Sequence, residues 1–307
     1  MAATTDVPGD APGTAPARLD LLLFLVMSLV WGSTWIAAKA GINAVPPVFF
    51  AACRYVLVGG LLLALVPGVA RLLAGPGAGR LWLTGTLVNT GTYATLLWGM
   101  QHVASGVAGL VNLPMVAIGL YALELARGEA RLTWRHPAAL LLGLAGLAML
   151  FRQDAAIGGG GMEMLGILAI LAGTFSYCLG SVLSRPLLQQ GVTPFQLTGA
   201  QAVVGALGLS LVSAALEPVR LADFATLAEP LPLASLLFMV ILGTFTAYTI
   251  YLRLMRNWGA SKAGLYAFVS PVVALVLGRL VYDEPLGLDQ AAAALLLLGA
   301  AVIAVRR

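Results

Sequence analysis

The feature that most constrains the fold of this chain is a succession of long apolar runs separated by short connections. Ten such runs can be marked, at residues 20–40, 46–66, 80–101, 104–124, 135–151, 163–184, 194–216, 231–252, 261–283 and 287–305. About 20 helical residues, each rising ~1.5 Å, cross the ~30 Å hydrocarbon core of a bilayer. Charged residues make up only 10% of the chain, against roughly a quarter in soluble domains. The sequence therefore predicts an all-α integral membrane protein with ten transmembrane helices.

The basic residues predict the orientation of these helices. Most of the 17 Lys and Arg residues lie on the same side as the N-terminus, whereas Lys39, Arg152 and Arg220 lie on the other side. Connections rich in Lys and Arg usually stay in the cytoplasm. We therefore expect a multi-pass protein of the cell (inner) membrane with both termini cytoplasmic. Residues 1–17, rich in Ala, Pro, Gly and Thr, are expected to form a disordered cytoplasmic tail.

The second half of the chain repeats the first. Residues 104–123 open with Ala-Ser, continue with Ala-Gly-Leu and carry Pro114 at mid-run, and residues 260–284 do the same around Pro271. Further matched pairs, at an offset of about 150 residues, are Lys39 with Arg185, Pro47 with Pro194, Arg54 with Gln201, Tyr93 with Tyr248 and Met100 with Met255. Because five crossings is an odd number, the second copy must enter the membrane from the opposite side. This predicts two inverted five-helix repeats with a site near the midplane.

The repeated motifs resemble those of a known family. The run Trp31-Gly32-Ser33-Thr34-Trp35, followed by Lys39, Pro46-Pro47 and Arg54-Tyr55, resembles the first two helices of the EamA family of the drug/metabolite transporter superfamily. The two Ala-Ser and proline runs resemble its fourth and ninth helices. The resemblance implies a central cavity formed by helices 1–4 and 6–9, with helices 5 and 10 at the periphery.

The same resemblance divides the chain. The first EamA-like repeat is expected at 18–152 and the second at 162–307, joined by a Gly-rich connection at 153–161. A homodimer through helices 5 and 10 is the assembly that such peripheral helices would permit.

Polar and aromatic residues follow helical periodicity within the runs expected at the centre. Close helix packing would explain stripes of Ser, Thr and Gly, but buried Trp and Tyr also need partners for their polar ends. A shared amphipathic cavity accommodates all the stripes. The expected substrate-binding residues are Trp31, Trp35, Arg54, Asn89, Tyr93, Asn112, Tyr177, Tyr248, Tyr266 and Ser270.

The sequence leaves two alternative roles for each of Arg54, Pro114 and Pro271. Arg54 lies too deep in the second run for its charge to reach the bilayer surface easily. It is either a structural residue bonded to polar neighbours or an anchor for an anionic substrate group. Pro114 and Pro271 each free a backbone carbonyl, so they either only kink their helices or mark a helix break or gate beside a wet cavity.

Several residue types are missing from the centres of the runs. No Asp or Glu lies near the middle of any run, and His102 and His136 fall at run ends. Exporters that exchange cationic drugs for protons need a buried carboxylate, so neutral or zwitterionic substrates are favoured. Cys53 and Cys178 lie within separate apolar runs and predict neither a disulfide nor a metal site. We therefore expect no metal, no cofactor and no nucleic-acid partner.

We expect a secondary transporter or facilitator that moves small metabolites outward by alternating access, with amino acids as the first candidates. The alternative is an anionic-metabolite carrier that uses Arg54 and Lys39, as the sugar-phosphate branch of the superfamily would suggest. A membrane enzyme or sensor is a third hypothesis, and the lack of a catalytic set and of a soluble domain disfavours it. The expected partners are a small-molecule substrate and the lipid bilayer.

Overall fold

The computed structural model describes residues 14–103, 105–129, 131, 133–150, 161–282 and 287–305. Within these ranges it does not describe the side chains of residues 14–17, 35–36, 39, 105–107, 109–110, 150, 274, 277–282 and 304–305. Residues 1–13 of the expected tail and residues 153–160 of the expected connection lie outside the described residues, as do the side chains of Trp35, Lys39 and Arg279. Residues 14–17, also expected in the tail, belong to the first helix.

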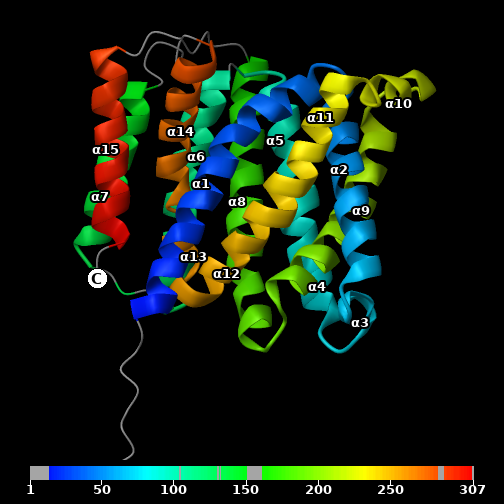
Figure 1. The fold of residues 1–307 in the computed structure, drawn as a ribbon, viewed down its shortest axis with the longest axis horizontal. Coiled ribbons are helices and arrows are strands. Elements are labelled where there is room, and N and C mark those ends of the chain that lie inside the picture. The colour runs from blue at the N-terminus through cyan, green and yellow to red at the C-terminus, as the bar shows by residue number, and fades with distance from the viewer. Residues whose placement is uncertain are drawn as a thin grey trace, which may run out of the picture.

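Helices account for all ten expected spans (Figure 1). The first repeat comprises α1 (Thr14–Ile42), α2 (Pro47–Leu65), α4 (Ala78–Gly85) continuing through the π-helical segment η1 (Thr86–Gly91) into α5 (Thr92–Met100), α6 (Ser105–Ala126) and α7 (Arg135–Leu150). The second comprises α8 (Gly161–Gln189), α9 (Pro194–Leu216), α11 (Pro230–Phe238) continuing through η2 (Met239–Tyr248) into α12 (Thr249–Trp258), α13 (Ala260–Ala263) with α14 (Tyr266–Tyr282), and α15 (Leu288–Val305).

The inverted arrangement of the two repeats is confirmed by contacts at one end of the bundle. Asp20 near the start of α1 accepts a hydrogen bond from Asn257 near the end of α12. Arg185 near the end of α8 pairs with Glu124 near the end of α6. The equivalent helices α1 and α8 therefore run in opposite directions. Helix pairs also recur: α8 packs on α5 and α6 as α1 packs on α12 and α14.

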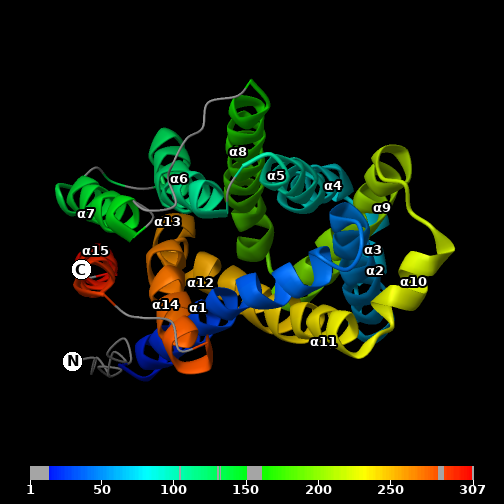
Figure 2. The ribbon, with the colours of Figure 1, turned by 90° about the horizontal axis from the view of Figure 1, so that it is seen from above.

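Seen from above, the last helix of each repeat lies at the edge of the bundle, and the other helices surround its centre (Figure 2). The edge pair is α7 and α15, which pack along each other, so the predicted peripheral position of helices 5 and 10 is confirmed. A homodimer through these two helices stays a prediction.

The outer surface suits a lipid environment. Four described helices are long and apolar enough to cross a membrane, at Pro47–Leu65, Gly161–Gln189, Pro194–Leu216 and Pro230–Trp258. Large apolar side chains such as Leu57, Leu211 and Leu295 are exposed on the bundle. In water such a surface would be unfavourable, whereas lipid tails accept it without cost.

Some local features were not expected from the apolar runs. Short helices α3 (Val69–Ala74) and α10 (Leu221–Leu227) occupy connections. The third and eighth spans each contain a π-helical segment at equivalent positions, which in proteins often marks a functional site. The ninth span is not continuous, because a turn at 264–265 separates α13 from α14.

The N-terminus of α2 is capped by a side chain from the other repeat. Val48 N and Phe49 N donate hydrogen bonds of 2.8 and 2.7 Å to the carboxylate of Glu217, which follows α9. Ser213 Oγ donates to the same carboxylate over 2.8 Å. These backbone N–H groups have no partner within α2, so the carboxylate satisfies them and also favours the positive end of the helix dipole. At the opposite end of α2, where α9 begins, Gln196 Nε2 donates a hydrogen bond to Pro67 O.

This cap predicts a stability effect. Glu217→Ala should destabilise the folded protein by about 0.5–2 kcal/mol, the usual range for loss of a helix cap, and lower the melting temperature in detergent. Glu229 is a suitable control, because it precedes α11 as its N-cap residue but makes no side-chain cap hydrogen bond. Equal shifts for Glu217→Ala and Glu229→Ala would contradict the assigned role.

Candidate functional site

A cavity of about 570 Å³ lies inside the ring of helices. Its mouth includes the exposed residues Asn43 and Gln101, at the end of the bundle where α1 and α5 end. We call this end the mouth end. The cavity reaches inward to Asn89 and Tyr248 on the two π-helical segments.

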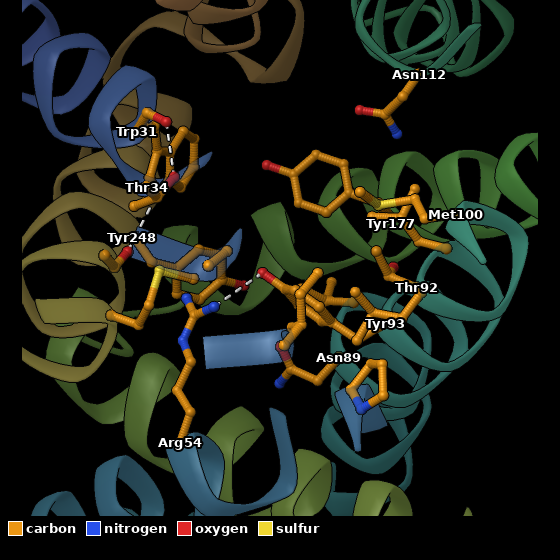
Figure 3. Close-up of a pocket in the computed structure, with 18 of the residues that line it drawn as sticks. Trp31, Thr34, Arg54, Asn89, Thr92, Tyr93, Met100, Asn112, Tyr177 and Tyr248 are labelled. Carbon is orange, nitrogen blue, oxygen red and sulfur yellow. Dashed lines mark hydrogen bonds between the residues drawn. The ribbon is translucent and has the colours of Figure 1, made fainter. Parts of the chain in front are cut away.

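Most of the residues expected to bind substrate surround this one cavity. The lining includes Trp31, Arg54, Asn89, Tyr93, Asn112, Tyr177, Tyr248, Tyr266 and Ser270 (Figure 3). Only Trp35 is missing from the expected set, because its side chain lies outside the described residues. Substrate binding by these residues stays a prediction, but the structure brings them together from seven different spans of the two repeats.

Arg54 is the charged group of the cavity wall. The residue is only 5% exposed. Its Nε donates to Thr244 Oγ1 over 2.7 Å, and Nη1 makes a long 3.5 Å contact with Tyr93 OH. The guanidinium also lies over the rings of Tyr55 and Tyr93, at 5.2 and 5.5 Å from their centroids. Among the described residues no carboxylate pairs with it, so all its partners are neutral.

Aromatic rings form another part of the cavity wall. Trp31 packs against Tyr266 at 4.3 Å between ring centroids and against Tyr251 at 5.5 Å. Trp31 Nε1 donates to Gly243 O in η2 over 3.0 Å. The hydroxyl of Tyr177 has no hydrogen-bond partner among the described residues, and Figure 3 shows it directed toward the side of the cavity that Trp31 occupies. Because this hydroxyl is itself buried, the wall is largely apolar.

The smaller polar residues are partly engaged by the protein itself. Asn89 Nδ2 donates to Gln201 O over 2.7 Å, and Asn112 Nδ2 donates to Thr174 Oγ1 over 2.8 Å. Ser270 Oγ makes a 3.3 Å bond to Ser28 O. Each amide thus holds two helices together and presents its remaining atoms to the cavity.

The two prolines lie just behind the cavity wall. Pro114 in α6 and Pro271 in α14 are buried, and their neighbours Leu113 and Ser270 line the cavity. Neither proline lines it directly. Their proposed role as helix breaks or gates stays a prediction.

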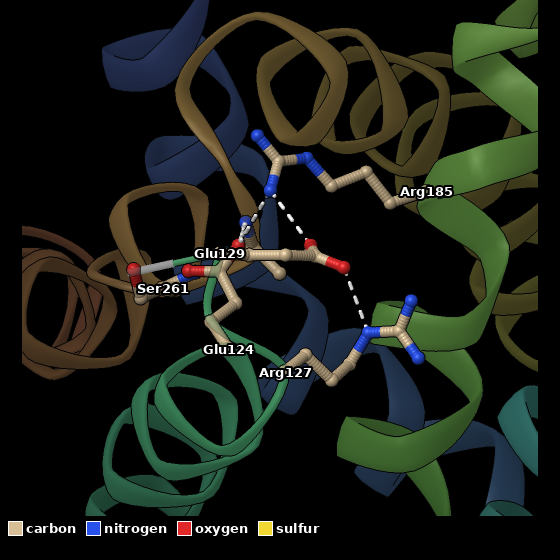
Figure 4. A network of polar contacts seen from close by, with 6 residues as sticks. Glu124, Arg127, Glu129, Arg185 and Ser261 are labelled. Carbon is tan, nitrogen blue, oxygen red and sulfur yellow. Dashed lines mark hydrogen bonds and ion pairs between the residues drawn. The ribbon is translucent and has the colours of Figure 1, made fainter. Parts of the chain in front are cut away.

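The end of the bundle opposite the mouth is closed by a network of ion pairs. We call it the closed end. Glu124, only 2% exposed, accepts hydrogen bonds from the backbone N–H groups of Ala260 and Ser261 at the start of α13. Arg185 Nη1 bridges Glu124 and Glu129 at 3.4 and 2.9 Å (Figure 4). Nearby, Arg253 Nε lies 3.1 Å from the buried carboxylate of Asp20.

Sequence reasoning gave Glu124 no role. The repeat predicts none, because the distance between Pro114 and Glu124 differs from that between Pro271 and Glu284. The structure shows that it pairs with the other repeat instead. Gly259, with a φ of 94°, precedes α13, whose first N–H groups need an acceptor. The sequence shows only Gly259-Ala260-Ser261 and does not indicate that Glu124 is this acceptor.

Taken together, inverted repeats around one cavity with a mouth at a single end define a membrane transporter. The chain belongs to the EamA-like transporter family, whose family model matches residues 18–152 and 164–306. The match covers both repeats, so it confirms the resemblance inferred from the motifs.

Individual proteins agree with this assignment. The uncharacterized transporter YvbV of Bacillus subtilis (strain 168) is 28% identical over 87% of this chain and 85% of its own length. The uncharacterized inner membrane transporter YedA of Escherichia coli (strain K12) is 28% identical over 83% and 80%. A probable amino-acid metabolite efflux pump of Salmonella typhimurium (strain LT2) is 25% identical over 87% and 89%. One protein crystal structure, 21% identical, has a TM-score of 0.76 and covers 94% of this chain and 96% of that chain, which supports the fold.

The closed end predicts a pH effect through Glu129. Partial burial alone would raise the pKa of Glu129, but hydrogen bonds from Arg127 and Arg185 and their charges outweigh it and hold the pKa below the ordinary 4.5. A carboxyl with a lowered pKa stabilises the fold above its unfolded pKa, and this stabilisation is lost as pH falls through the folded pKa. At pH 7, Glu129→Gln should therefore lower the free energy of unfolding by less than about 1 kcal/mol. The melting temperature should fall slightly. The difference from the parent protein should vanish in acid.

The control for this experiment is Glu229→Gln, at an exposed position without a cap bond. Melting temperatures measured from neutral to strongly acid pH should show no such convergence for it. A Glu129→Gln difference that stays constant at all pH values would contradict the electrostatic role.

Proposed function

We propose that this protein exports amino acids or similar small zwitterionic metabolites across the inner membrane, as a secondary transporter or facilitator that works by alternating access. The observation that carries the proposal is Arg54, a buried guanidinium in the cavity wall with only neutral partners. A buried charge without a counter-ion is costly. A substrate carboxylate in the cavity would offset this cost.

The geometry of Arg54 suits a carboxylate. Its Nε is occupied by Thr244, and its Nη1 makes only the long contact with Tyr93. The terminal nitrogens therefore stay available for a bidentate, charge-assisted pair. The hydrogen bond to Thr244 and the rings of Tyr55 and Tyr93 hold the guanidinium in place before substrate arrives.

The rest of the cavity suits the remainder of an amino acid. Its volume of about 570 Å³ lies within the usual range of small-molecule sites. Apolar side chains such as Leu97, Leu113 and Val116 would accept an apolar substrate side chain. The aromatic faces would accept an ammonium group through cation–π contacts.

Two further considerations favour amino acids over doubly charged anions. Arg54 is the only cationic side chain among the described residues that line the cavity, whereas a phosphate ester would be held better by two cations. The anionic-metabolite alternative needs Lys39 as well, and its side chain lies outside the described residues. Related proteins named as probable amino-acid metabolite efflux pumps support the same choice.

The orientation completes the proposal. If both termini are cytoplasmic, the mouth end faces outward and the cavity stands in the state from which an exporter releases its substrate. The ion pairs of the closed end would then separate the cavity from the cytoplasm. Kinks at Pro114 and Pro271 would act where the helices must bend to open that end.

A liposome screen tests the proposal. Purified protein in liposomes should exchange radiolabelled neutral amino acids such as L-leucine above the level of protein-free liposomes. Because no carboxylate lines the described cavity, exchange should persist without a pH gradient. Transport of cationic dyes instead of amino acids, or exchange that requires a pH gradient, would contradict it.

Arg54→Lys separates a binding role from a structural one. A hydrogen bond to a charged group contributes about 1.5–3 kcal/mol, and a lysine does not reproduce the bidentate fork. We therefore expect affinity for the transported amino acid to fall roughly tenfold to hundredfold. Affinity and melting temperature are measured on one preparation, with Arg256→Lys, exposed on α12, as the control. A lower melting temperature with unchanged affinity would remove Arg54 from the site.

A further inference from the structure

Arg54 and Gln201 occupy equivalent positions on the equivalent helices α2 and α9. Their surroundings match as well. Arg54 contacts Tyr93 of its own repeat, and Gln201 Oε1 accepts a 2.6 Å hydrogen bond from Tyr248, the counterpart of Tyr93. Each repeat therefore places a polar side chain of its second span beside a tyrosine of its third span. We call the pair Arg54 and Tyr93 and the pair Gln201 and Tyr248 the two centres.

The contacts between repeats follow the same symmetry. Thr244 lies four residues before Tyr248, and Asn89 lies four residues before Tyr93. Thr244 accepts a hydrogen bond from the Arg54 side chain, and Asn89 donates one to the backbone carbonyl of Gln201. Each centre is thus held by one π-helical segment of the opposite repeat.

The two centres differ in how they are closed. Gln201 is 0% exposed, and its Nε2 donates to Thr84 Oγ1 over 3.1 Å and to Ser184 Oγ over 2.8 Å. Arg54 faces an open cavity. At the sequence offset that relates Tyr93 to Tyr248, the counterpart of Thr84 is Met239. At the offset that relates Lys39 to Arg185, the counterpart of Ser184 is Ala38. Both Met239 and Ala38 line the cavity. The region that is packed shut around Gln201 is therefore open around Arg54.

We propose that Gln201 is a second substrate-positioning residue, which faces the cavity when the cavity opens at the closed end. This inference rests on the proposed function. Inverted repeats achieve alternating access by exchanging their arrangements around a fixed site. When the repeats have exchanged their arrangements, the cavity opens at the closed end. In that state Thr84 and Ser184 move away from Gln201, and the space around Arg54 closes. The carboxamide, which both donates and accepts hydrogen bonds, then contacts the polar end of the substrate.

Replacing a cation by a neutral amide has a functional consequence. Charge-assisted hydrogen bonds are roughly twice as strong as neutral ones. A substrate carboxylate is therefore held more weakly when the cavity opens at the closed end. This difference in affinity between the two conformations does not drive net flux. Over a complete transport cycle it is offset by the equilibrium between the two substrate-free conformations.

The first test needs no substrate. In a chain with Cys53→Ala and Cys178→Ala, Gln201→Cys or Ser184→Cys introduces a single thiol, and a membrane-impermeant sulfonated thiol reagent is added to one side of oriented vesicles. We expect both thiols to be labelled only from the side of the closed end. Ser184→Cys is nearly isosteric, so it reports even if Gln201→Cys folds poorly.

Two controls define the background of this test. Asn43→Cys, exposed at the mouth, should be labelled only from the mouth side. Leu209→Cys, buried further along α9, should stay unlabelled from either side. If the test thiols are labelled from the mouth side, or no more than Leu209→Cys, the proposal is wrong.

The second test measures sided affinity for L-leucine in oriented vesicles. Gln201→Met should weaken affinity on the side of the closed end by up to about tenfold, as expected for loss of a neutral hydrogen bond, and leave the mouth side unchanged. Equal losses on both sides would show a structural role and overturn the proposal. If the parent protein binds no amino acid, the proposed function fails, while thiol labelling still decides whether Gln201 opens.

Discussion

The packing of α2 along α9 is the contact on which the rest of the bundle depends. These equivalent helices run antiparallel, and their ends are tied by Glu217 and Gln196. Glycines allow the close approach: a Cβ on Gly59 would lie 2.9 Å from Val203 N, and one on Gly199 would lie 2.7 Å from Leu62 Cβ. Small residues serve this purpose in membrane helix pairs because lipid provides no hydrophobic drive for association. The same contact fixes Arg54 and Gln201 relative to one another.

Charge is distributed unevenly along the bundle. At the closed end Glu124 and Asp20 are buried but each is paired with an arginine. Glu124 also accepts hydrogen bonds from backbone N–H groups, and Asp20 accepts one from the Asn257 side chain. Such pairs offset much of the cost of burial only where hydrogen bonding is good, and here they also close one end of the cavity. Arg54, midway along the bundle, has no comparable partner among the described residues. Among the buried charges that the structure describes, those at the closed end are thus paired and Arg54 is left available to a ligand.

The sequence predicted the ten spans, the inverted repeat and the peripheral position of α7 and α15, because run length and motif duplication survive any detail of packing. It could not predict the π-helical segments or the break between α13 and α14, since no composition signal distinguishes them from α-helix. The polar stripes correctly placed Asn89, Tyr177 and Tyr266 beside one cavity. Periodicity gives the face of a helix but not the partner that fills it. The closed state of Gln201 and the capping role of Glu124 therefore required coordinates.

We propose that the cavity recognises a carboxylate through Arg54. Competition between the amino acid that the protein binds best and the corresponding amide tests this most directly, because the two ligands differ only in the carboxylate. The measurement is displacement of the radiolabelled amino acid from purified protein. We expect the amide to compete at least about tenfold more weakly than the unlabelled acid. Equal competition by the two would contradict it.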